Sequence, residues 1–198
     1  MHKNPLVVVI SGPSGVGKDA TIAGLKQTGA RFHYVVTATT RKMRENETDG
    51  VDYYFLSKAE FEKKISHDEF LEYAEVYGNY YGVMKQEVKK ALDKGEDVII
   101  KVDVQGARTF KKKVPDAVFI FLVPPSISDL AQRLVSRNAD SKKDLDIRLS
   151  KAEEEMKMVE MFDYGVVNHT DDLTRTAETV KNIVEAERRR VIQRNFKL

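Results

Sequence analysis

The stretch Gly12-Pro13-Ser14-Gly15-Val16-Gly17-Lys18 decides the fold, because it joins a β-branched apolar run to a segment with helical periodicity. The run from Leu6 to Ile10 predicts a strand buried on both faces, and the spacing of Ile22 and Leu25 predicts a helix. Glycines at such a turn let backbone N–H groups and the positive end of the helix converge on one anion. The spacing Gly-x-x-x-x-Gly-Lys predicts a phosphate-binding loop rather than an ordinary glycine-rich turn, although Asp19 stands where Ser or Thr is expected.

Composition limits the remaining possibilities. The chain has 198 residues, 32% of them charged, with a formal net charge of +2 and no cysteine. This length fits one α/β domain, the balanced charge gives no indication of a nucleic-acid partner, and disulfide or thiolate chemistry is excluded. Met1 to Pro5 is too short for a targeting segment, and no apolar run is long enough to span a bilayer. We therefore expect a cytoplasmic protein with no membrane partner, and the oligomeric state stays open.

Strands alternate with helices in both end regions of the chain, which predicts a doubly wound parallel sheet. The later predicted strands are 97–103, 118–123 and 164–168. The predicted helices are 105–113, a helix beginning at Ser128 as N-cap, 145–162 and 173–194.

The region from about Arg41 to Lys90 breaks this alternation and predicts an inserted subdomain. It follows a β-rich run at 33–37, and it contains a short strand at 53–55 and a capping box at Ser57 to Glu60. The segments 71–77 and 80–83 predict a hairpin that turns at Gly78-Asn79, and 86–94 predicts a helix.

Two groups of side chains in and beside this region suit a nucleotide. Arg41 and Arg44 follow a strand end, and with the hydroxyls of Tyr53 and Tyr81 they form a typical cradle for a phosphate dianion. Glu72 lies inside a predicted strand. An ionised carboxylate suits the adjacent N–H donors of guanine and would repel the adenine edge.

Asp103, at the end of a predicted parallel strand, is a second carboxylate of this kind. The phosphate cradle and the carboxylates together predict a nucleotide acceptor site. The four histidines, by contrast, have no metal-ligand spacing and are interpreted as structural or surface residues.

These residues fall into motifs that resemble the guanylate kinase family, from Leu6 to about Arg190 and in the family's order. The motifs are Gly12 to Lys18, Thr39-Thr40-Arg41-x-x-Arg44, Asp52-Tyr53-x-Phe55, Phe70-Leu71-Glu72, Gly78-Asn79-Tyr80-Tyr81-Gly82, Asp103-Val104-Gln105-Gly106, Arg133-Leu134-x-x-Arg137 and Arg148-Leu149. The resemblance implies transfer of the terminal phosphoryl group of ATP to GMP, giving ADP and GDP with Mg²⁺.

The resemblance also implies a fold and a set of site residues. The implied fold is a P-loop parallel-sheet core at about 1–37, 95–135 and 163–198, a GMP-binding insertion at about 38–94 and a helical lid at about 136–162. The implied ATP-binding residues are Gly12, Pro13, Ser14, Gly15, Val16, Gly17, Lys18, Asp19, Arg133, Arg137 and Asn168. The implied GMP-binding residues are Thr37, Arg41, Arg44, Tyr53, Glu72, Tyr81 and Asp103. The implied catalytic residues are Lys18, Arg44, Arg137 and Arg148, because phosphoryl transfer develops charge that cations neutralise.

Three departures from the family pattern accompany the resemblance. Asp19-Ala20 replaces the usual pair of hydroxyl residues, Val83 replaces a hydroxyl residue after Tyr-Gly, and Lys101 occupies a position that is often acidic. A carboxylate suits Mg²⁺, so Asp19 is the candidate metal ligand. We expect an active enzyme with an altered metal dependence.

Two other functions remain open at this stage. A different nucleoside monophosphate kinase would share the phosphate loop and the lid arginines but should lack a carboxylate reader for guanine. A non-catalytic guanylate-kinase-like binding module would keep the fold, but such modules typically lose the loop lysine and glycines, which are present here.

Overall fold

The core of the molecule is a sheet of five parallel strands. A computed structural model describes residues 4–76, 78–136, 142–169 and 172–196. The strands are β1 (Val7–Ser11), β2 (His33–Tyr34), β7 (Val98–Lys101), β8 (Val118–Val123) and β9 (Tyr164–Val167), in the order β2-β7-β1-β8-β9. The central strand β1 pairs with β7 on one side and β8 on the other. Its carboxyl end is therefore the point at which ligands bind in doubly wound sheets.

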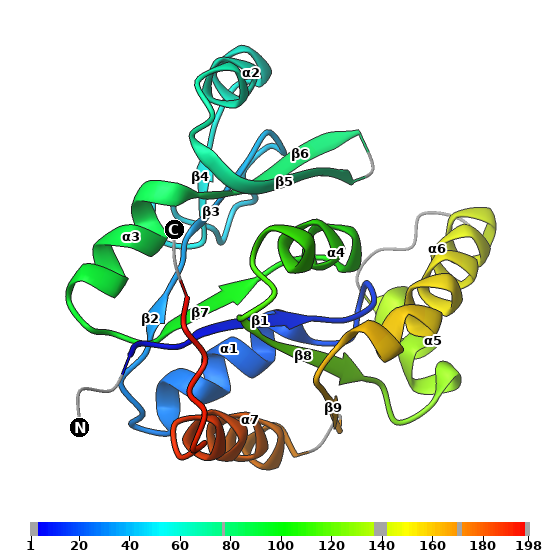
Figure 1. Ribbon diagram of the computed structural model, residues 1–198. Coiled ribbons are helices and arrows are strands. Elements are labelled where there is room, and N and C mark those ends of the chain that lie inside the picture. The colour runs from blue at the N-terminus through cyan, green and yellow to red at the C-terminus, as the bar shows by residue number, and fades with distance from the viewer. Residues whose placement is uncertain (1–3, 77, 137–141, 170–171, 197–198) are drawn as a thin grey trace.

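Helices cover both faces of this sheet because the side chains of β1 are buried on both sides. Val8 and Ile10 pack in one apolar cluster with α1 (Lys18–Gln27) and α7 (Leu173–Glu187). Val7 and Val9 pack in the other cluster with α3 (Lys85–Asp93) and α4 (Val104–Lys113). Figure 1 shows α1 and α7 below the sheet and α4 above it, which is the layered α/β architecture expected from the sequence.

A second, smaller sheet stands above α4 (Figure 1). Its strands are β3 (Thr37–Thr39), β4 (Tyr53–Phe55), β5 (Phe70–Val76) and β6 (Asn79–Met84), in the order β4-β3-β6-β5. The pair β5 and β6 is the predicted antiparallel hairpin. Helix α2 (Lys58–Ser66) begins with the predicted capping box between Ser57 and Glu60.

Two helices lie at the opposite side of the parallel sheet from β2. Helix α5 (Ile127–Ser136) and helix α6 (Lys142–Met156) pack through Leu130, Leu134 and Ala152, and a 3₁₀ helix, η1 (Lys157–Met161), leads back to β9. Part of the predicted lid, including Arg137, lies outside the described residues.

Several predicted elements differ from the structure, among them the helix predicted at 145–162, which is divided into α6 and η1. The run 33–37 is divided between two sheets, because His33 pairs with β7 while Thr37 pairs with β4. Helix α5 begins after Ser126, whose hydroxyl accepts the N–H of Asp129, so Ser128 is not the N-cap.

The last helix also differs from the prediction, because α7 ends at Glu187 and not at Arg194. Arg194 instead donates to Glu187 and to the carbonyl of Ala117. No helix in the described part of the chain is long and apolar enough to cross a membrane.

Phe61 provides a test of what holds the small sheet together. It is fully buried, and its ring stacks on Phe70 at 4.3 Å and on Tyr80 at 5.3 Å between ring centroids. We expect Phe61→Ala to lower the free energy of unfolding by about 3–5 kcal/mol, measured by denaturant titration. Tyr73→Ala, at a partly exposed edge of the same cluster, is the control and should cost clearly less. Equal losses in the two variants would contradict this account.

Candidate active site

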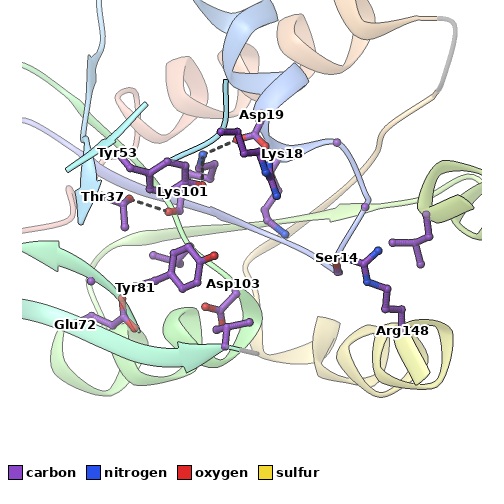
Figure 2. Close-up of a pocket in the computed structure, with 17 residues that line it drawn as sticks. Ser14, Lys18, Asp19, Thr37, Tyr53, Glu72, Tyr81, Lys101, Asp103 and Arg148 are labelled. Carbon is purple, nitrogen blue, oxygen red and sulfur yellow. Dashed lines mark hydrogen bonds and ion pairs between the residues drawn. The ribbon is translucent and has the colours of Figure 1, made fainter. Parts of the chain in front are cut away.

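A cavity of about 250 Å³ opens between the glycine loop and the small sheet. Many of the predicted site residues line it (Figure 2). The glycine loop and the start of α1 contribute Ser14, Gly15, Gly17, Lys18 and Asp19, the small sheet contributes Thr37, Tyr53, Glu72 and Tyr81, and Arg44 and Asp103 also line the cavity. Arg148, from α6, joins them near Ser14. The cavity therefore has one end built by the turn after β1 and another built mainly by the small sheet.

The glycine loop requires glycine at three positions. Gly12, Gly15 and Gly17 have φ values of 145°, 82° and 100°, which L side chains rarely adopt. A Cβ on Gly12 would lie 2.6 Å from the carbonyl oxygen of Leu122, and one on Gly17 would lie 2.4 Å from Nδ2 of Asn168. The loop thus keeps its shape only with glycine at these three positions.

Lys18, the first residue of α1, folds back over the loop. Its Nζ donates to the carbonyl oxygens of Gly12, at 2.6 Å, and Pro13, at 3.2 Å. Burial lowers the pKa of Lys18, and the carboxylates of Glu155, Asp103 and Asp19 oppose this effect only in part. A phosphate group near this ammonium would favour its charged form.

Glu155 is a site residue that the sequence analysis did not find. It lies on α6 and is 9% exposed, and its Oε2 accepts the backbone N–H of Ser14 at 3.1 Å. Burial raises the pKa of this carboxyl, while the Ser14 N–H and the nearby Lys18 lower it. A side chain of α6 therefore takes one of the loop N–H donors that an anionic ligand would use. Only its contact across the fold reveals this role, since Glu155 is one of three consecutive glutamates on a helix.

The two arginines of the predicted phosphate cradle share a second carboxylate, Glu47. Its Oε1 accepts from Nη2 of Arg41 at 2.7 Å, and its Oε2 accepts the backbone N–H of Arg44 at 2.9 Å. The hydrogen bond that Arg41 donates to Glu47 is the main reason that the pKa of Arg41 is raised. The Arg41 guanidinium also lies over the ring of Tyr53, 5.4 Å from its centroid.

Glu72 and Asp103 both line the cavity (Figure 2). Glu72 is 2% exposed, and its Oε1 has no hydrogen-bond partner. Burial raises the pKa of Glu72 to about 8, and the nearby charge of Asp103 adds to the effect. Asp103 also serves as the N-cap of α4, since its Oδ1 accepts the N–H groups of Gln105 and Gly106. An unpaired buried acceptor is costly, so this end of the cavity suits a ligand that brings N–H donors.

Asp19 and Lys101, two of the departures noted in the sequence, contact each other. The Nζ of Lys101 donates to Oδ1 of Asp19 at 2.5 Å and to the hydroxyl of Tyr53 at 3.1 Å (Figure 2). Burial lowers the pKa of Lys101, but Tyr53 and Asp19 outweigh it, so the net shift is upward and the ammonium stays charged. The negative charge of Asp19, just after the loop, is thus paired with the positive charge of Lys101 at the end of β7.

Arg133 and Asn168 contact the loop from outside the cavity. Arg133 donates to the carbonyl oxygens of Val16 and Asn168, and the amide of Asn168 donates to Val16. Neither these two side chains nor Arg41, Gly12, Pro13 and Val16 line the cavity. Their predicted contacts with nucleotides stay predictions.

A metal ion would find few protein ligands here. Within the described ranges, no group of three or more His, Asp or Glu side chains could hold one. Mg²⁺ in kinases is typically bound by one or two carboxylates together with phosphate oxygens and water. Asp19 lines the cavity beside Lys18 and its side chain is 58% exposed, so one carboxylate of the kind that Mg²⁺ prefers is present, and its Oδ1 is paired with Lys101.

Three features together define the class of P-loop nucleoside monophosphate kinases. They are a parallel sheet with a glycine loop after β1, a second sheet that carries cations and carboxylates, and helices that carry further arginines. Comparison with known proteins identifies the family. The Guanylate kinase family model matches residues 4–187. The chain belongs to the guanylate kinase family, whose members transfer a phosphoryl group from ATP to GMP and give ADP and GDP.

The similarity to individual relatives extends over nearly the whole length of this chain and of each relative. The chain is 48% identical to a guanylate kinase of Lactococcus lactis, over 96% of this chain and 92% of that protein. It is 44% identical to one of Latilactobacillus sakei, over 96% of this chain and 94% of that protein. The crystal structure of guanylate kinase from Anaplasma phagocytophilum has a TM-score of 0.77 at 32% identity, over 96% of this chain and 89% of that one.

Glu155 makes the occupation of the glycine loop testable. A donor phosphate and the Glu155 carboxylate repel each other near the same N–H group, so removal of the charge should favour the nucleotide. We expect Glu155→Gln to bind ADP about 3- to 10-fold more tightly than the unchanged protein, measured by calorimetry. Glu154→Gln, one position earlier and exposed, is the matched control. Weaker ADP binding in Glu155→Gln would show that the carboxylate supports the loop instead.

Proposed function

We propose that the cavity is the active site of an ATP:GMP phosphotransferase, with GMP at the small-sheet end and ATP at the glycine loop. The observation that carries this proposal is the buried, unpartnered Oε1 of Glu72 beside Asp103. Guanine presents two adjacent N–H donors at its Watson–Crick edge, and adenine does not. Glu72 and Asp103 would accept these donors, and Thr37 would lie near the base edge.

The acceptor phosphate would lie between the base site and the loop. Arg41, Arg44, Tyr53 and Tyr81 would hold it, which requires Arg41 to exchange part of its contact with Glu47 for the phosphate. The rings of Tyr53 and Tyr81 are 6.1 Å apart and edge-to-face, which supports a shared role for their hydroxyls. The acceptor oxygen is already ionised, so the reaction needs no general base.

The donor phosphates would lie on the loop N–H groups and on Lys18. Transfer would proceed by in-line attack of the GMP phosphate oxygen, with Arg44 and Arg148 neutralising the charge that develops on the transferred group. Arg137, outside the described residues, is proposed for the same role. Arg133 and Asn168 would support ATP binding through the loop carbonyl that they already hold.

Mg²⁺ is the proposed cofactor. It would be bound mainly by ATP phosphates, with Asp19 as the protein ligand, and it would neutralise the phosphate charge. We also propose that the acceptor site belongs to an insertion at about 38–94 and that about 136–162 forms a lid over ATP. The approach of Glu155 and Arg148 from α6 toward Ser14 supports the second assignment.

A substrate panel tests the proposed function directly. Formation of ADP should depend on GMP or dGMP, and AMP, UMP and CMP should be at least about 100-fold poorer acceptors, since they lack the donor pair that Glu72 accepts. Glu72→Gln should weaken GMP about 10-fold or more and leave ATP nearly unchanged. Equal effects of Glu72→Gln on both substrates would contradict the guanine-reader assignment, and no GMP-dependent turnover would favour a binding module.

The raised pKa of Glu72 predicts a pH dependence for guanosine binding. With a pKa of about 8, the carboxyl is mostly protonated at pH 6–7 in the empty protein and must ionise to accept two donors. Guanosine affinity should therefore rise about tenfold per pH unit between pH 6 and 7.5 and level off above pH 8, measured by calorimetry. Guanosine avoids the titration of the GMP phosphate. Glu72→Gln should abolish the dependence, and a flat profile in the unchanged protein would contradict it.

The ionisation of Glu72 should also change the stability of the fold, which should decrease as pH rises, whereas guanosine affinity increases. The folded-state pKa lies above the ordinary value of 4.5, so the folded protein binds the extra proton between those values. The contribution of Glu72 to stability is therefore fully present below pH 4.5 and is lost as pH rises through about 8.

A further inference from the structure

Lys101 occupies the junction between the two ends of the cavity. It is the last residue of β7, and in the sheet register it pairs with Ile10, just before the glycine loop. Its side chain is 20% exposed and lines the cavity together with Lys18, Arg44 and Tyr53. An ammonium group here faces any phosphate that binds in the cavity.

The hydrogen bonds of Lys101 leave one donor unused. A lysine ammonium has three N–H donors. In the structure two of them have partners, Oδ1 of Asp19 at 2.5 Å and the hydroxyl of Tyr53 at 3.1 Å. A desolvated cation favours a further acceptor, and the cavity is where one can enter.

The position of Tyr53 indicates which ligand would supply that acceptor. The Tyr53 hydroxyl lies 3.1 Å from the Lys101 ammonium and Tyr53 lines the cavity, so a phosphate bound at this hydroxyl would adjoin Lys101. Asp19 fixes this ammonium from the other side. A carboxylate at this point also repels phosphates, and Lys101 compensates for its charge.

We propose that Lys101 is an additional phosphate-binding residue of the acceptor site, which Asp19 holds in place and which donates to the GMP phosphate. This inference rests on the proposed function. It accounts for Asp19 and Lys101 as one unit, in which a carboxylate and an ammonium replace the hydroxyl and the acid usual at these two positions. GMP binding should consequently depend on both residues even without ATP or metal.

The test compares the binding of GMP and guanosine, measured by calorimetry in EDTA without ATP. Lys101→Met should weaken GMP about 10- to 100-fold, the size expected for a charge-assisted hydrogen bond, and change guanosine by less than about twofold. Lys101→Arg should retain most of the GMP affinity. Lys181→Met removes a lysine that is similarly covered and ion-paired on α7, outside the cavity, and should change neither ligand.

A double-mutant cycle tests the link to Asp19. Asp19→Ser alone should weaken GMP severalfold, because the ammonium loses the carboxylate that fixes it. In the Lys101→Met background the same change should have no weakening effect. Additive losses in the two backgrounds would overturn the proposed unit.

The outcomes separate the inference from the proposed function. Arg44→Met should also weaken GMP relative to guanosine, since Arg44 is assigned to the acceptor phosphate. If Arg44→Met lowers the preference for GMP and Lys101→Met leaves it unchanged, the inference is overturned and the acceptor site stands. If neither variant changes the preference, the proposed acceptor site itself is wrong. A purely structural role of Lys101 would lower the melting temperature and leave the ratio of the two affinities unchanged.

Discussion

The structure depends on a constraint in the glycine loop. Three parts of the fold approach three glycines of this loop more closely than a side chain would permit. Gly12 faces the carbonyl of Leu122 on β8, Gly15 faces Leu134 on α5, and Gly17 faces Asn168 after β9. Each contact is closer than a Cβ would allow. The packing of the sheet and of α5 is therefore coupled to the shape of the phosphate site, and one side chain added here would disturb all of them.

A second feature is that carboxylates of the chain pair with its cations and with an N–H group of the loop. Glu47 pairs with Arg41, Asp19 pairs with Lys101, and Glu155 accepts from the loop at Ser14. Isolated positive charges and directed N–H groups are costly when partly buried, so a stable empty protein needs such partners. A nucleotide phosphate bound here would exchange one anion for another, which would reduce the net gain in binding free energy and make binding sensitive to these acids.

Glu72 is the opposite case, because its Oε1 has no such partner. Burial raises the pKa of this carboxyl, so it can hold a proton and avoid an unpaired buried charge. The close approach of α4 explains the burial, because a Cβ on Gly106 would lie 2.7 Å from Oε1 of Glu72. A ligand at Glu72 would therefore need N–H donors, whereas the cations Arg41 and Lys101 are already paired with carboxylates of the chain.

The sequence by itself determined the loop, the layered fold, the hairpin and many of the residues that line the cavity. These depend on spacing within one or two turns or strands, where local geometry leaves few alternatives. It did not place the break in 33–37, the end of α7 at Glu187, or the approach of Glu155 to Ser14 across 141 positions. Asp19 and Lys101 were recognisable as separate departures, but their pairing across 82 positions was decided only when β1 and β7 became neighbours. Contacts of this kind follow from the order of strands in the sheet, which no local pattern of residues encodes.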